Sequence, residues 1–312
     1  MTTLLITHPC FVLHDTGPGH PERPDRLRAL DRLFAHEVFA PLQREEAPLR
    51  ADVEEAIVLA HPQRYLDYVK NARPGEDEEP VRLDPDTVLS PGSWEPALRA
   101  VGAGLLAVDR VMDKASGIKN AFAQVRPCGH HAEAERAMGF CFFNNVAVGA
   151  AHALDHHGLE RVAVLDFDVH LGNGTEDIFR NDPRVLLCSS YQYPLYPDMN
   201  PPSVPGHIVN CPLPPGSGSE AFRAAVTDHW VPALDAFRPQ LVFISAGFDA
   251  HANDPLAELS LGTRDYTWVT GVACDVAERH CGGRVVSTLE GGYDLTALAT
   301  SAAAHIERLM HS

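Results

Sequence analysis

The chain has little positive charge and no long apolar segment. It carries 25 lysine and arginine residues against 42 aspartate and glutamate residues, a formal charge of −17 at neutral pH. A surface of that sign repels nucleic-acid phosphates and anionic lipid headgroups, so we expect neither nucleic acid nor a membrane as a partner. No stretch approaches the roughly 18 consecutive apolar residues that a bilayer span needs.

Cysteine-pairing motifs and a secretion signal are also missing. The seven cysteines include no C-x-x-C pair, and residues 1–8 show no basic stretch followed by a long apolar run. These features predict a reduced, cytoplasmic protein. They leave the oligomeric state open, and a homo-oligomer is compatible with them.

The pattern of apolar residues predicts one α/β domain over residues 1–312. With 45% hydrophobic residues, the chain can bury one large core. Short apolar runs typical of buried parallel strands occupy 4–6, 121–123, 162–165, 185–187, 241–244 and 285–286. Helical periodicity occupies 24–38, 93–113, 144–157, 219–237, 264–280 and 295–310. This alternation favours a parallel sheet with helices on both faces, and segments 75–80 and 194–215 are predicted surface loops.

Polar residues cluster directly after four of the predicted strands. These clusters occupy 126–131, 166–170, 247–254 and 290–293. Because the carboxyl ends of parallel strands lie on one edge of a sheet, we expect the four clusters to converge on a single crevice.

Asp168 and His170 have the spacing of metal ligands. Side chains two residues apart in an extended segment leave on the same face, and Asp254 from the neighbouring loop is the expected third ligand. One imidazole and two carboxylates leave positions open for water and substrate, which is typical of a catalytic metal. Zinc suits this set best, although Fe²⁺, Co²⁺ and Mn²⁺ are also admitted.

Two adjacent histidines and a tyrosine are the candidate catalytic groups. His130 and His131 sit on a turn rich in proline and glycine, which favours general acid and base work in the crevice. The same dipeptide at 156–157 ends a helical stretch, where we expect a solvated surface instead. Tyr293 follows two glycines, and its phenol is placed to donate to a carbonyl oxygen that gains negative charge.

Five motifs stand at or near the predicted strand ends: RPCGHHA at 126–132, GFCFFN at 139–144, DFDVHLGNGT at 166–175, SAGFDA at 245–250 and LEGGY at 289–293. Together they resemble the histone deacetylase family, in the class II-like branch that includes bacterial deacetylases and amidohydrolases. The segment GHPERPDRL at 19–27 is similar to the same branch. The resemblance implies the arginase-deacetylase fold, with a mainly parallel eight-stranded sheet, and zinc-dependent removal of acyl groups from acyl-lysine or related amines.

The resemblance also implies residue roles. It assigns zinc to Asp168, His170 and Asp254, general base and acid work to His131, and carbonyl polarisation to Tyr293. His130 is the electrostatic partner of His131, oriented by Asp166, and Asn173 lies beside His131. Expected substrate-binding residues are Gly139, Phe140, Tyr196, Leu256, Gly291 and Gly292. Structural K⁺ ions are implied at Asp166, Asp168, His170 and Ser189, and at the backbone around Phe179, Asp182 and Val185.

Four departures from the family pattern stand near the expected site. Cys128 replaces a usual proline, Phe167 a common tryptophan and Leu171 a frequent second histidine, while residues 197–200 replace a usual P-G-T-G. Acetylpolyamines and other small amides remain alternative substrates, although the apolar Leu256 favours acyl-lysine. An arginase-like ureohydrolase with two Mn²⁺ ions and a non-catalytic acyl-lysine binder are the rival functions.

Overall fold

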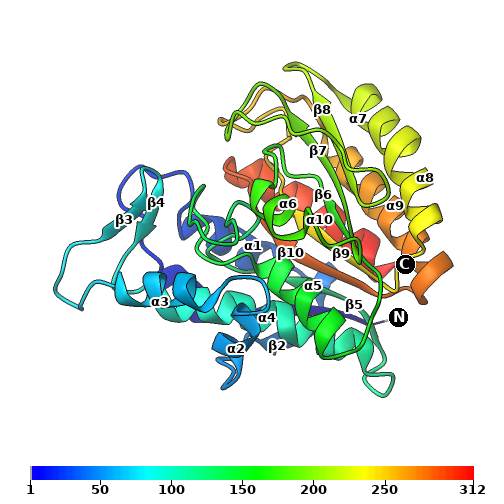
Figure 1. The fold of residues 1–312 in the computed structure, drawn as a ribbon. Coiled ribbons are helices and arrows are strands. Elements are labelled where there is room, and N and C mark those ends of the chain that lie inside the picture. Colours follow the sequence, from blue (N-terminus) through cyan, green and yellow to red (C-terminus); the bar gives the residue numbers. More distant parts are fainter. Residues whose placement is uncertain (1) are drawn as a thin grey trace.

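An eight-stranded parallel sheet forms the centre of the computed structural model, which describes residues 2–312 (Figure 1). The strand order is β2-β1-β5-β10-β9-β6-β7-β8, and every ladder in it is parallel. The strands are β1 Thr2–Thr7, β2 Gln43–Glu46, β5 Ile118–Ala123, β6 Val162–Asp166, β7 Val185–Gln192, β8 Ile208–Leu213, β9 Leu241–Ala246 and β10 Val285–Leu289. A separate hairpin pairs β3 Val81–Asp84 with β4 Thr87–Leu89. The predicted α/β fold with an eight-stranded sheet is confirmed.

Helices cover both faces of the sheet, as the alternation of strand and helix predicted. The pair α4 and α5 packs on one face, whereas α1, α9 and α10 pack on the other (Figure 1). The helices are α1 Asp25–Phe34, α2 Val53–Ile57, α3 Gln63–Asn71, α4 Trp94–Met112, α5 Asn145–Asp155, α6 Asn173–Phe179, α7 Ser219–Ala225, α8 Val231–Phe237, α9 Thr263–Cys281 and α10 Leu295–Met310. Within residues 2–312, no helix combines the length and apolar character that a membrane crossing requires.

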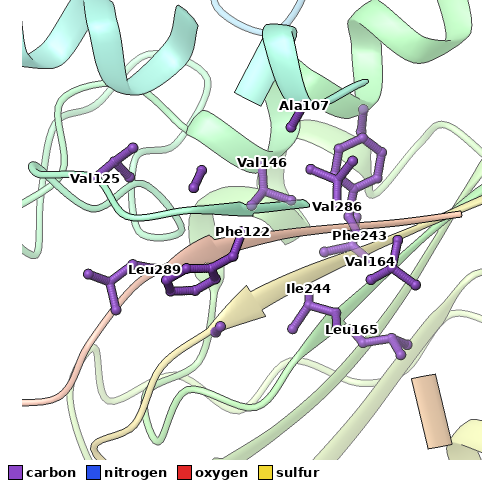
Figure 2. Close-up of a cluster of buried hydrophobic side chains, with 14 of the residues drawn as sticks. Ala107, Phe122, Val125, Val146, Val164, Leu165, Phe243, Ile244, Val286 and Leu289 are labelled. Atoms are coloured by element: carbon purple, nitrogen blue, oxygen red, sulfur yellow. The ribbon is translucent and has the colours of Figure 1, made fainter. Parts of the chain in front are cut away.

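The central strands are apolar because both of their faces are buried. Figure 2 shows Phe122, Val164 and Phe243 from three of these strands, together with Ala107 of α4 and Val146 of α5, in one hydrophobic cluster. All five side chains are buried. Burial of this surface on both faces holds the sheet in place, so that the strand ends form a rigid platform.

The two edge strands are where the sequence-based prediction is wrong. Segment 194–215, predicted as a loop, contains β8, and β2 was not predicted at all. The missed signal has a physical reason, since edge strands are partly solvated and lack a continuous apolar run. Pro212 is tolerated in β8 because an edge strand needs ladder hydrogen bonds on only one side. The acidic segment 75–80 does lie outside helices and strands.

Two buried histidines outside the polar clusters are neutral in the folded protein. His305 lies with Nδ1 2.6 Å from the Thr270 hydroxyl and Nε2 2.8 Å from the Ser287 hydroxyl. His61 Nε2 accepts a hydrogen bond from the backbone N–H of Asn144 and therefore carries no proton. Burial lowers the pKa of His305 to about 3 and that of His61 to about 4.

We therefore expect the free energy of unfolding to fall as the pH drops below about 6.5. In that range the unfolded chain binds protons at these imidazoles and the folded chain does not, so each contributes a slope of about 1.4 kcal/mol per pH unit. Denaturant unfolding of His305→Gln between about pH 6 and pH 5 should show a slope smaller by that amount. His229→Gln, at an exposed position, is the control and should keep the slope of wild type. Identical slopes for wild type and His305→Gln would contradict the neutral state assigned to His305.

Candidate active site

The four polar clusters predicted from the sequence meet at one edge of the sheet. Strands β5, β10, β9 and β6 are consecutive neighbours and end at Ala123, Leu289, Ala246 and Asp166. The turns that follow them carry the histidine pair, the GGY segment and the aspartates. The structure thus brings together in space the residues that the sequence spreads over more than half of its length.

His130 lies against two buried carboxylates. Its Nδ1 is 3.0 Å from Asp166 Oδ2, and its Nε2 is 3.7 Å from Asp168 Oδ1. Burial alone would lower the pKa of His130, but Asp168 and Asp166 outweigh it and hold that pKa well above its usual range. The contact to Asp166 fixes the orientation of the His130 ring, and the two carboxylates favour its protonated form.

His131 has the opposite protonation state and a different partner. Its Nδ1 is 2.8 Å from Asn173 Oδ1, while Asn173 Nδ2 donates to Glu133 Oε1 at 2.8 Å. Because the amide oxygen faces the imidazole, Nδ1 carries the proton and Nε2 keeps a free lone pair. Burial, reinforced by the neighbouring His130 and His170, lowers the pKa of His131 well below its usual range.

Asp168, His170 and Asp249 offer a compact set of metal ligands. One ligand atom from each lies within 4.8 Å of the other two, and all three side chains are buried. His170 Nδ1 is 3.1 Å from Asp168 Oδ1 and 3.2 Å from Asp249 Oδ2. Apart from this contact with His170, Asp249 Oδ2 has no hydrogen-bond partner among the described residues. The sequence placed Asp249 in the polar cluster without giving it a role.

Asp254, the predicted third ligand, lies close to this set but outside its tight group. Its Oδ2 accepts the backbone N–H of Tyr293 at 2.7 Å, and its Oδ1 accepts the N–H of Leu256 at 3.0 Å. Burial and the neighbouring carboxylate of Asp249 raise the pKa of Asp254 to about 7. Three buried carboxylates thus surround the single imidazole of His170, an excess of negative charge that a bound cation would neutralise.

The predicted potassium residues are arranged in two places. Asp166 of β6 is the register partner of Ser189 of β7, and the Ser189 hydroxyl is buried with no hydrogen-bond partner among the described residues. Phe179, Asp182 and Val185 form a turn in which the Asp182 N–H donates to Phe179 O and the Val185 N–H donates to Asp182 O. The orphaned hydroxyl beside a buried carboxylate suits a monovalent cation at the first place.

A cavity of about 370 Å³ leads to this set of residues. It is lined by His20, Pro21, Arg82, Pro85, Asp86, His131, Gly139, Phe140, His170, Leu195, Tyr196, Leu256 and Tyr293. We call it the catalytic tunnel. It joins a candidate base, a candidate metal ligand and the phenol to four of the predicted substrate-binding residues, whereas Gly291 and Gly292 lie outside its lining.

Gly139 and Phe140 form a tight wall of the catalytic tunnel. Both adopt positive φ, 55° and 73°, which is rare for phenylalanine and costs backbone strain. A side chain at Gly139 would meet the His131 ring at 2.5 Å, so only glycine fits there. The Phe140 ring lies 6.0 Å from that of Tyr293, and the Tyr196 ring lies 5.2 Å from that of His131.

Gly291 is required for a different reason, because it lies directly against the aspartates. Its N–H donates to Asp168 Oδ2 at 2.8 Å, and a methyl group on it would collide with Asp249 Oδ2 and approach Asp168 Oδ2 to 2.6 Å. Gly291→Ala is therefore expected to weaken binding of a divalent metal by about 10–100-fold. Competition with a chromophoric chelator measures this, and Gly262→Ala, which points into open space, is the control. Equal affinities for both variants would contradict the expectation.

Comparisons with known proteins agree with this arrangement of residues. Residues 20–309 match the histone deacetylase domain. The chain belongs to the histone deacetylase family. It is 40% identical to a histone deacetylase-like amidohydrolase of Pseudomonas aeruginosa, over 96% of this chain and 79% of that protein. It is 37% identical to a probable deacetylase of Archaeoglobus fulgidus, over 95% of this chain and 82% of that protein. The crystal structure of the HD domain of HDA15 superposes with a TM-score of 0.88 at 31% identity, covering 100% of this chain and 90% of the other.

Membership of the histone deacetylase family makes the chain a hydrolase of the deacetylase and amidohydrolase type. Three of the departures from the family pattern noted in the sequence are buried within the fold. Cys128, at a position where the family usually has proline, lies with its Sγ 3.3 Å from that of Cys141, and both thiols are buried. Phe167 and Leu171 are buried core residues on either side of the aspartate and histidine.

One part of this histone deacetylase site was not found from the sequence. Glu22 is fully buried and binds Arg126 through both carboxylate oxygens and Arg26 at 3.2 Å. Arg26 also donates to the backbone carbonyl oxygens of Glu290 and Gly292, directly beneath Tyr293. The motif at 19–27 was noted only as part of the resemblance. No local signal links it to residues more than 100 positions away, and the structure shows that it braces the GGY segment.

Proposed function

We propose that the protein hydrolyses acyl-amines, with acyl-lysine as the preferred class and zinc as the metal. The observation that carries this proposal is the catalytic tunnel, into which the neutral imidazole of His131, the phenol of Tyr293 and the metal-ligand candidate His170 all project. A narrow channel with these groups along its lining suits an extended acyl chain and a planar amide.

The residues present fit a zinc ion. We propose Asp168, His170 and Asp254 as its ligands, and Asp249, which shares the compact group with Asp168 and His170, stands beside them as a further carboxylate. When bound, zinc lowers the pKa of a water molecule to about 7 and polarises a carbonyl group. The excess of buried carboxylates over imidazole in the cluster supports this choice of a divalent cation.

His131 is proposed as the base and then the acid. Its Nδ1–H is committed to Asn173, which leaves the Nε2 lone pair free to accept a proton from the attacking water. The same nitrogen then returns the proton to the departing amine. The adjacent cationic His130, whose ring centre lies 4.1 Å away, opposes a second positive charge and makes His131 ready to release the proton.

Tyr293 and the tunnel walls are proposed to handle the acyl group. Burial, followed by the neighbouring Cys128 and Asp249, raises the pKa of Tyr293 well above its usual range, so the phenol stays protonated and can donate a hydrogen bond. This donation stabilises negative charge as it develops on the acyl oxygen. Phe140 and Tyr196 provide apolar walls for the chain that carries the amide.

The apolar Leu256 in the lining supports acyl-lysine over cationic polyamine chains, although Asp86 of the β3–β4 turn also lines the catalytic tunnel. Acetylpolyamines and other small amides are therefore the alternative substrates to compare. We also propose that K⁺ binds near Asp166 and Ser189 and in the turn 179–185, where it would stabilise the strand ends under the histidines.

We further propose a cytoplasmic location, in keeping with the seven unpaired thiols.

A substrate panel tests the proposed function. Acetyl-lysine, trifluoroacetyl-lysine, longer acyl-lysine and acetylpolyamine substrates are compared with wild type, Tyr293→Phe and chelator-treated protein. We expect Tyr293→Phe to lose about 10²–10³-fold in kcat, and zinc to restore the chelated enzyme. Metal-loaded wild type that binds acyl-peptide and releases no product would instead support the non-catalytic binder.

A further inference from the structure

Three histidines and an aspartate gather at the end of α5, away from the catalytic tunnel. His152 and His156 lie one helical turn apart, His157 follows, and Asp109 comes from the neighbouring α4. One ligand atom from each of the four lies within 4.8 Å of all the others. Because α5 ends just before β6 begins, the cluster lies toward the opposite edge of the sheet.

The sequence predicted that His156 and His157 are both solvated, and this is correct only for His156. His156 is exposed, but His157 is half-buried and its Nε2 lies 2.9 Å from Asp109 Oδ1. Buried His152 places its own Nε2 2.8 Å from the same oxygen. The His152 and His156 rings stack with centres 4.8 Å apart and planes at 9°. Two imidazoles therefore contact a single carboxylate oxygen, and the ring of His156 lies against both of them.

Two of the ligand-atom spacings in this cluster are close to those of a tetrahedral zinc site. Zinc binds imidazole nitrogen at about 2.0–2.1 Å, which puts ligand atoms roughly 3.3 Å apart. The two distances to Asp109 Oδ1 are slightly shorter than that, and the whole set spans at most 4.8 Å. Small movements of the exposed His156 and of His157 would open a space for one ion, while buried His152 and half-buried Asp109, which Arg50 holds, stay in place.

The charges around the cluster leave one oxygen of Asp109 for a metal. Arg50 Nη1 lies 2.5 Å from Asp109 Oδ2, and the same guanidinium makes two bonds of 2.8 Å to Asp52. Asp52 thus balances the charge of Arg50, which orients Asp109 and occupies its other oxygen. A single carboxylate oxygen and three imidazoles then complete four ligands.

We propose that His152, His156, His157 and Asp109 form a second metal site, which binds Zn²⁺ or a similar divalent transition metal. With four protein ligands no position remains for a substrate, so the site is structural. The ion would cross-link α4 to α5, the pair that covers one face of the sheet. This site is independent of the proposed chemistry in the catalytic tunnel.

Metal stoichiometry tests the proposal on the full chain. Wild type, His156→Asn/His157→Asn and His280→Asn are stripped with a chelator, dialysed against Zn²⁺ and analysed for bound zinc. His280 is the matched control because its Nε2 lies 2.8 Å from Asp235 with no second histidine at that carboxylate. We expect about two ions per chain in wild type and the control, and about one in the double variant.

Two further readouts separate this site from the catalytic one. The double variant should keep its hydrolase activity yet lose part of the rise in melting temperature that Zn²⁺ gives wild type. When both proteins are loaded with Co²⁺, the double variant should show weaker absorption from four-coordinate Co²⁺ than wild type. One ion in wild type and none in the double variant would support this site and count against the metal at Asp168. Equal zinc content and equal melting shifts in wild type and double variant would overturn the proposal.

Discussion

Replacing His131 with alanine is expected to lower the rate of acyl-amine hydrolysis by about 10²–10⁴-fold, the usual contribution of a general base and acid. The adjacent His130 cannot replace the Nε2 lone pair that Asn173 secures at His131, because Asp166 and Asp168 contact its ring and favour its protonated form. We expect the substitution to change kcat more than KM, because the imidazole transfers protons during the reaction and does not bind the substrate chain.

Steady-state kinetics on an acetyl-lysine or trifluoroacetyl-lysine peptide measure this loss. His229→Ala, at an exposed position outside the lining of the catalytic tunnel, is the control and should keep wild-type rates. Metal content should be unchanged in His131→Ala, because His131 is not among the candidate ligands. A His131→Ala enzyme within a factor of about ten of wild type would exclude this residue as the general base.

Replacing Glu22 with glutamine is expected to destabilise the fold by about 3–5 kcal/mol. Glu22 has no exposed surface and is the carboxylate that faces both Arg26 and Arg126, each fully buried. Although burial opposes its ionisation, Arg126 holds the pKa of Glu22 below its usual range. Glutamine would leave two buried guanidinium groups without a compensating negative charge.

Denaturant unfolding of wild type and Glu22→Gln measures the effect of this substitution. The exposed pair Arg64 and Glu135 is the matched control, and Glu135→Gln should leave the free energy of unfolding close to that of wild type. Since Arg26 holds the carbonyl oxygens of Glu290 and Gly292, Glu22→Gln should also disorder the GGY segment and reduce activity at temperatures where the fold survives. Equal stability losses at positions 22 and 135 would contradict the role assigned to the buried cluster.

The centre of the fold could be predicted from the sequence, and its edges could not. Strands such as β6 and β9 are buried on both faces, so they show as continuous apolar runs, and helices such as α4 show their periodicity over 19 residues. Strand β2 reads Gln43–Glu46 and has no apolar residue, because its place at the sheet edge leaves it partly exposed. Nothing in that segment distinguishes it from a loop.

The same division holds for the site. Asp168 and His170 could be predicted as neighbours because only one residue separates them, although the chain bends at 168–170, directly after β6, and does not continue as extended strand. The position of Asp254 relative to Asp249 depends on an irregular loop, so the sequence could not say which carboxylate lies nearest His170. The ion cluster of Glu22 escaped prediction because one of its two arginine partners, Arg126, lies 104 positions away along the chain.

Diffraction recorded on either side of the zinc absorption edge, from crystals of the zinc-loaded protein, tests the central claim most directly. A metal-specific peak touching Asp168, His170 and Asp254 at the base of the catalytic tunnel is the predicted result. A peak that touches Asp249 in place of Asp254 would correct the third ligand and leave the chemistry standing. No peak near His170 in crystals of active enzyme would contradict metal-assisted hydrolysis at this site.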